Sequence, residues 1–127
     1  MRIIKKDDKV IAIVFDGQFQ DGTTPITDGK WPLQIISLKY PKGKIWPGHY
    51  HKPMTRTTEG QMEALIIISG SVKVSIYFEK DLVEVLKLNS GQGVMLVNSG
   101  FGMEVLEDAE MLEFKNGPFV EDKIVFE

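Results

Sequence analysis

Apolar side chains recur at every second residue along much of this chain, and this alternation restricts the fold more than any other feature. The clearest stretch is SVKVSIYF at residues 71–78, where Val72, Val74 and Ile76 fall on one face of an extended segment. No window shows apolar residues spaced three and four apart, which is the spacing of an amphipathic helix. The sequence therefore predicts an all-β protein.

Six further apolar or alternating runs predict short strands between turns rich in Gly, Pro, Asn and Asp. They cover residues 10–15, 32–40, 63–69, 82–88, 93–97 and 109–114. Ser69-Gly70-Ser71 is typical of a tight hairpin between two strands, and residues 18–30 have the composition of a polar loop. Many short strands at even spacing are typical of a sandwich or barrel. No linker or repeat divides the chain, so we expect one domain over residues 1–127.

Composition narrows the possible functions. The chain has 127 residues, a formal net charge of −3 and no cysteine. Disulfides, thiolate metal ligands and a cysteine nucleophile are therefore excluded. The scattered basic residues give no footprint for nucleic acid or for an acidic membrane surface. No signal peptide or membrane span is visible, and a cytoplasmic protein is the expectation.

The stretch GHYHKPMTRTTEGQME at residues 48–63 contains the only two histidines, His49 and His51. We expect them to lie on a strand, so that both imidazoles project from the same face. Glu63, at the start of the next predicted strand, can add a carboxylate. Two imidazoles and a carboxylate suit a divalent ion such as Zn, Fe, Ni or Mn. The alternative is a pair of surface histidines beside a Pro-Gly turn.

The spacing of these residues resembles the first signature of the cupin superfamily. Gly43, five residues, His49-Tyr50-His51, and then Glu63, six residues and Gly70 match its intervals. The interval between His51 and Glu63 is longer than in most cupins, which implies an enlarged loop at the barrel mouth. The resemblance implies a single-domain jelly-roll β-barrel and, within it, a metal held by His49, His51 and Glu63. 

A second cupin signature is present in degenerate form. LNSGQGVMLVNSGFGMEV at residues 88–105 is similar to it, but Phe101 stands where the family places a fourth ligand. The chain also resembles small bacterial cupins encoded with surface-polysaccharide genes. The likeness covers about residues 32–114. Glu59 is a competing carboxylate, but only Glu63 has the matching interval to Gly70.

Three functions remain open under this resemblance. In the first, His49, His51 and Glu63 hold a metal, and Phe101 forms an apolar wall beside a sugar or sugar nucleotide. In the second, the site has no metal, and His51 and His49 act as acid or base, as in cupins that isomerise or epimerise nucleotide-linked keto-sugars. In the third, the barrel binds a small molecule and catalyses nothing.

Two further expectations concern partners. Lys52 and Arg56 follow the histidines and can clamp an anionic substrate, or they are solvated loop charges. The apolar run VIAIVF at residues 10–15 is a candidate to cover a sheet edge, with residues 1–31 in packing or in a dimer contact. We therefore expect a homodimer with a small-molecule ligand.

Overall fold

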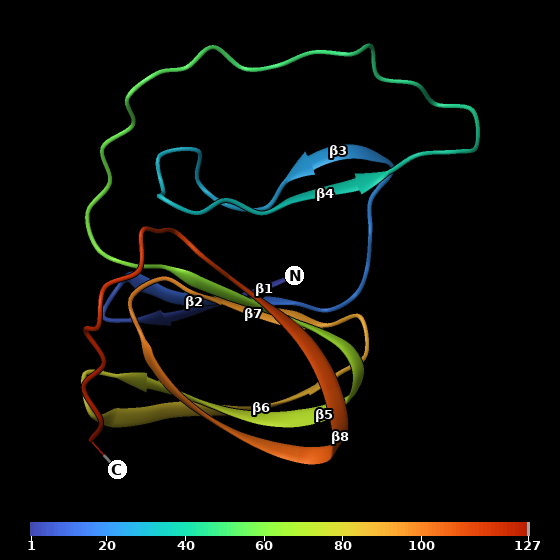
Figure 1. Ribbon diagram of the computed structural model, residues 1–127. Helices are drawn as coiled ribbons and strands as arrows, with labels where there is room; N and C mark the ends of the chain where they lie inside the picture. The colour runs from blue at the N-terminus through green and yellow to red at the C-terminus, as the bar shows by residue number, and fades with distance from the viewer. Residues whose placement is uncertain (127) are drawn as a thin grey trace. The chain divides into compact units, whose positions relative to one another are not determined.

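The computed structural model describes residues 1–126, which form eight β-strands and no helix. This confirms the all-β prediction. The strands are β1 (Arg2–Lys6), β2 (Lys9–Phe15), β3 (Gly22–Pro25), β4 (Ile36–Lys39), β5 (Glu63–Phe78), β6 (Asp81–Asn89), β7 (Gly93–Leu96) and β8 (Gly100–Lys115) (Figure 1). No helix among these residues is long and apolar enough to cross a membrane.

The chain divides into two compact units. We call residues 1–18 together with the chain from Gln61 onward the curled-sheet unit, because it holds the six-stranded sheet. We call residues 19–60 the hairpin unit, since its regular structure is the antiparallel pair of β3 and β4. Each unit has its own sheet.

Strand β5 organises the curled sheet. One of its edges pairs with β8 over nearly its whole length. Its other edge pairs first with β7, at residues 63–66, and then with β6, at residues 71–78. Beyond β7 the sheet continues through β2 to β1. Because one strand serves both halves of an antiparallel sheet, the sheet curls strongly into a half-barrel (Figure 1).

The curl is concentrated at Gly70. Here the pairing of β5 with β8 shifts register three times in succession, from Ile67 to Val72. Gly70 has a φ of 83°, and a Cβ at this position would lie 2.1 Å from the carbonyl oxygen of Asp108. The hairpin predicted at Ser69-Gly70-Ser71 is therefore wrong, because Gly70 forms a β-bulge within one continuous strand.

The core lies inside the curl. Val72, Val74 and Ile76 are fully buried, as the alternation predicts. They pack in one cluster with apolar residues from the other strands of the unit: Ile4, Ile11, Ala12, Val14, Leu65, Ile67, Leu86, Leu88, Val94 and Leu96. Much of the predicted run at residues 10–15 is in this cluster, and β2 is paired on both sides by β1 and β7. The predicted dimer contact of this region stays a prediction.

An ion pair links β1 to β6, the two ends of the strand order in the sheet. Nη1 and Nη2 of Arg2 donate to the carboxylate of Glu84, and the Nη1–Oε1 distance is 3.0 Å. This hydrogen bonding raises the pKa of Arg2 and lowers the pKa of Glu84. The pair shows how far the sheet curls, since strands at opposite ends of the order approach within the reach of two side chains.

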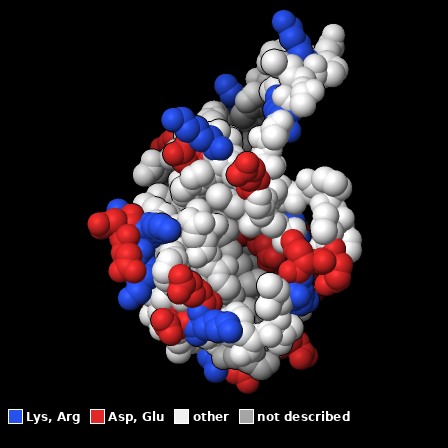
Figure 2. Space-filling model, turned by 90° about the vertical axis from the view of Figure 1, so that its left-hand side faces the viewer, with Lys and Arg blue, Asp and Glu red and all other residues white. Residues whose placement is uncertain are grey.

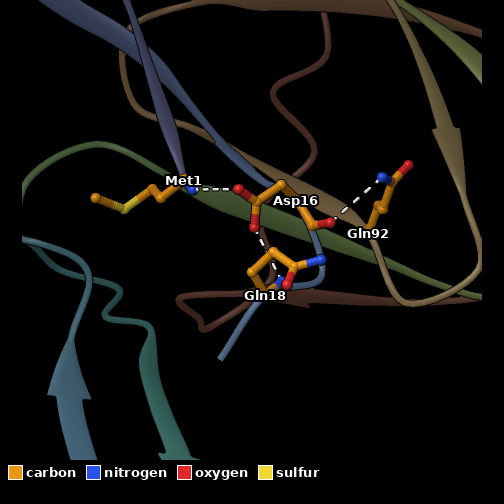
Figure 3. Close-up of polar contacts among 4 residues, drawn as sticks. All are labelled: Met1, Asp16, Gln18 and Gln92. Carbon is orange, nitrogen blue, oxygen red and sulfur yellow. Dashed lines mark hydrogen bonds and ion pairs between the residues drawn. The ribbon is translucent and has the colours of Figure 1, made fainter. Parts of the chain in front are cut away.

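Asp16 holds the beginning of the chain near the end of β2 (Figure 3). Its carboxylate accepts hydrogen bonds from the amino group of Met1 at 2.6 Å and from the backbone N–H of Gln18 at 2.9 Å. Its backbone carbonyl accepts a further hydrogen bond from the side-chain amide of Gln92, which follows β6. The bond from Met1 is the main reason that the pKa of Asp16 is lowered.

Three segments differ from the strand prediction. Only Ile36–Lys39 of the predicted strand at 32–40 is paired, and residues 41–62 form no strand. The polar segment 18–30, expected to be a loop, contains the short strand β3. The strand predicted at 109–114 is the second half of the much longer β8.

Candidate functional site

His49 and His51 lie in the hairpin unit, in the extended chain that follows β4. Both are exposed, their ring centroids are 5.6 Å apart, and Nδ1 of His49 lies 2.9 Å from the carbonyl oxygen of Pro47. The strand expected here is absent. Pro47 and Pro53 flank the pair and have no N–H to donate, which disfavours a paired strand.

Glu63 lies in the other unit, at the beginning of β5. Neither unit therefore contains the complete donor set that the sequence predicts. Within residues 1–126, no group of three or more His, Asp or Glu side chains is arranged to hold a metal ion. The residues as placed do not form a three-ligand site, so a metal bound by His49, His51 and Glu63 stays a prediction.

The structure does bring Glu63 and Phe101 together. Both line a pocket of about 500 Å³ in the curled-sheet unit. Leu96 and Val97 of the β7 region, with Lys115 from the end of β8, form further parts of its wall. Pockets of 300–1,000 Å³ are the usual size for small-molecule sites.

Glu63 is the most unusual ionisable group of this pocket. Its side chain is only 20% exposed, and burial is the main reason that its pKa is raised above the ordinary value. Nζ of Lys115 lies 3.8 Å from the carboxylate of Glu63 and 3.2 Å from that of Glu113. Its positive charge partly opposes the rise in the pKa of Glu63, whereas Glu113 and Asp122 add to it. Burial thus favours the neutral form of the Glu63 carboxyl more than that of an exposed carboxyl group.

The segment after β8 forms the remaining wall. Eight residues of the pocket lining, 119–126, come from this C-terminal segment. Asn116, before it, accepts a hydrogen bond from the backbone N–H of Met62 at 2.7 Å. At its other end, the ring of Phe126 packs edge-to-face on Tyr77 with the centroids 4.9 Å apart. The C-terminal segment thus crosses the pocket between two anchored points.

Ser99 adds an unsatisfied polar group to the same lining. Its hydroxyl oxygen is buried and has no hydrogen-bond partner among residues 1–126. A buried hydroxyl without a partner is costly, and a bound ligand or water can satisfy it. Sequence reasoning missed Ser99, because nothing in the run NSGFG distinguishes it from a turn residue.

Lys52 and Arg56 lie in the hairpin unit with the histidines. Together with His51 they line a shallow recess, and Nη1 of Arg56 contacts the carbonyl oxygen of Met54 at 3.5 Å. Both side chains are exposed. Their predicted role in holding an anionic substrate stays a prediction.

Comparison with known proteins does not identify a family for this chain. No protein-family model matches the chain, and no similar curated protein or solved structure was found. The all-β half-barrel is therefore established by the structure alone, and function must be argued from the site.

Proposed function

We propose that the protein binds a small polar molecule, of the size and character of a sugar, in the pocket of the curled-sheet unit. The observation that carries the proposal is the joint presence of Glu63 and Phe101 in one pocket of about 500 Å³. Aromatic rings can pack on the C–H faces of a sugar, and carboxylates accept hydrogen bonds from its hydroxyls. The unpaired hydroxyl of Ser99 offers one more polar contact.

A jelly-roll barrel of cupin type is part of this proposal. It is supported by the strong curl of the antiparallel sheet around one core and by the spacing of Gly43, His49, His51, Glu63 and Gly70. Barrels of this kind protect the edges of their sheets by pairing or closure. Such scaffolds commonly enclose ligand sites. Function itself rests on the pocket, because a fold does not determine what is bound.

A panel of neutral monosaccharides tests the proposal by isothermal titration calorimetry. Glu63→Ala and Phe101→Ala should each weaken binding of the tightest member by about tenfold or more, since each removes one wall contact. Glu107→Ala is the matched control, because Glu107 lies on β8, is exposed and does not line the pocket. Absence of binding by the whole panel, or equal loss in the control, would refute the proposal.

Metal binding by His49, His51 and Glu63 is a second candidate, favoured by the 5.6 Å separation of the two imidazole rings. Such a site would supply Lewis-acid chemistry beside the ligand. The protein purified without added metal or chelator should then contain about one divalent ion per chain, lost in His51→Ala. Phe101→His should raise the affinity for metal if Phe101 occupies the position of a fourth ligand.

Acid–base catalysis by His51 is the remaining alternative from the sequence. In that case His51→Ala should abolish turnover of a nucleotide-linked keto-sugar, and chelators should leave the turnover unchanged. Full activity of the variant would leave ligand binding without catalysis.

A further inference from the structure

Charge is distributed very unevenly between the two units. The hairpin unit contains six Lys and Arg residues against three Asp and Glu, a formal charge of +3. Because the whole chain carries −3, the rest of the chain carries −6. No acidic residue occurs between Asp28 and Glu59. The modest net charge of the chain therefore conceals a strongly basic stretch.

We call residues 39–56 the cationic segment. It contains five of the basic residues: Lys39, Lys42, Lys44, Lys52 and Arg56. Among residues 1–126, only Lys39 of this set forms an ion pair with a carboxylate, at 3.5 Å from Asp21. In Figure 2 the uppermost part drawn shows Lys and Arg side chains in blue and no acidic side chain in red. The other basic groups are thus available to an anionic ligand.

Aromatic side chains are interleaved with these charges. The rings of Tyr40 and Trp46 meet edge-to-face with their centroids 4.8 Å apart. Nζ of Lys44 lies 5.1 Å from the Tyr40 centroid and 5.4 Å from the Trp46 centroid, which is within the range of a cation–π interaction. The hydroxyl of Tyr40 also hydrogen-bonds to the hydroxyl of Thr23 on β3. This cluster is therefore fixed to the hairpin.

Large ring surfaces nevertheless remain uncovered. Trp46 is 50% exposed and Tyr50 is 88% exposed. Exposed aromatic rings beside unpaired cations match the two parts of a nucleotide, since a base stacks on a ring and a phosphate binds Lys and Arg. Arg56 can donate two parallel hydrogen bonds to one phosphate, which Lys cannot.

We infer that the cationic segment binds a ligand of nucleotide type, with its base stacked on Tyr50 or Trp46 and its phosphates held by Lys52 and Arg56, which line one recess. The inference does not depend on the pocket of the curled-sheet unit. The same chemistry occurs in a free nucleotide and in a single-stranded oligonucleotide. An anionic lipid surface is a different partner, and the interleaving of rings with charges favours the nucleotide.

Calorimetry on the full chain with ADP, adenosine, pyrophosphate and a ten-residue oligodeoxyadenylate tests this inference at 50 and 200 mM KCl. ADP should bind about tenfold or more tightly than adenosine or pyrophosphate, because only ADP uses both the rings and the charges. Its affinity should fall at the higher salt concentration. Tighter binding of the oligonucleotide would identify a polymer as the natural source of the same chemistry.

Variants separate the two parts of the site. Lys52→Ala combined with Arg56→Ala should weaken ADP binding about tenfold or more, and Tyr50→Ala should weaken it while Tyr50→Phe does not. Lys5→Ala combined with Lys6→Ala removes the same charge from β1 and should change nothing.

Four results would overturn the inference. They are no ADP binding at 1 mM, equal affinity for ADP and pyrophosphate, equal loss in the β1 control, and binding to phosphatidylserine vesicles without binding to ADP. If no monosaccharide binds, the inference about the cationic segment is unaffected. If ADP does not bind, the proposal of a ligand in the pocket of the curled-sheet unit is unaffected.

Discussion

Replacing Gly70 by alanine should destabilise the protein more than any other glycine substitution in a turn or bulge. Two costs add at this position. A φ of 83° costs an L-residue roughly 1–2 kcal/mol. The new Cβ would also lie 2.1 Å from the Asp108 carbonyl oxygen and 2.8 Å from the Ala109 Cα, and overpacking against backbone costs about 1–3 kcal/mol. The sum, about 2–5 kcal/mol, is a large part of the 5–15 kcal/mol that stabilises a typical domain.

Urea unfolding followed by circular dichroism measures this cost, with Gly91→Ala as the matched control. Gly91 has the same φ of 83°, but a Cβ added there meets no heavy atom within 4 Å. Gly91→Ala should therefore lower the free energy of unfolding only by the roughly 1–2 kcal/mol that a positive φ costs an L-residue. The difference between the two variants isolates the clash with β8. Equal losses in both variants would refute the role of Gly70 as the close-packed corner of β5 and β8.

Three other perturbations have defined outcomes. Because burial raises the pKa of Glu63, the stability of the wild type relative to Glu63→Gln should fall as the pH rises from 4.5 through the raised pKa. A difference between the urea midpoints of the two proteins that stays constant with pH would contradict this. Arg2→Ala should lower the free energy of unfolding by about 0–1 kcal/mol, since the pair with Glu84 is largely exposed. Because Arg2 lowers the pKa of Glu84, this loss should vanish as the pH falls through that lowered pKa, and a loss independent of pH and salt would exclude an ionic origin. Phe126→Ala should weaken ligand binding in the pocket while shifting the melting temperature little, and unchanged affinity in calorimetry would remove the C-terminal segment from the site.

The sequence predicts the strands well wherever alternation is long and uninterrupted. The stretches that form β6 and the second half of β5 follow this pattern, because burial of every second side chain is a strong constraint on an extended segment. β2 is predicted instead by its continuous apolar run, which is buried at four consecutive residues. Gly70 was misassigned for a physical reason. A glycine with positive φ between two serines serves equally in a hairpin turn and in a bulge, and only the partner strand decides between them.

The candidate site was predictable only in part. Glu63 and Phe101 were singled out by their spacing and lie in one pocket. Lys115 and the segment 119–126 were not, because their place in the pocket depends on the path of the chain after β8 and leaves no local pattern. The strand predicted around His49 and His51 failed because the polar turn chemistry and the prolines outweighed a short alternation.

The three partners of β5 also set an order for assembly. Its second half and β6 are joined by the two-residue turn at Glu79 and Lys80, so their pairing closes a loop as short as that of the β1–β2 hairpin. The pairing of Glu63 with Lys115 and of Ala12 with Leu96 requires loops of more than 50 and 80 residues, and such contacts slow folding. In a refolding pulse-exchange experiment, the amide hydrogens that join β5 to β6 should therefore be protected before those that join β2 to β7.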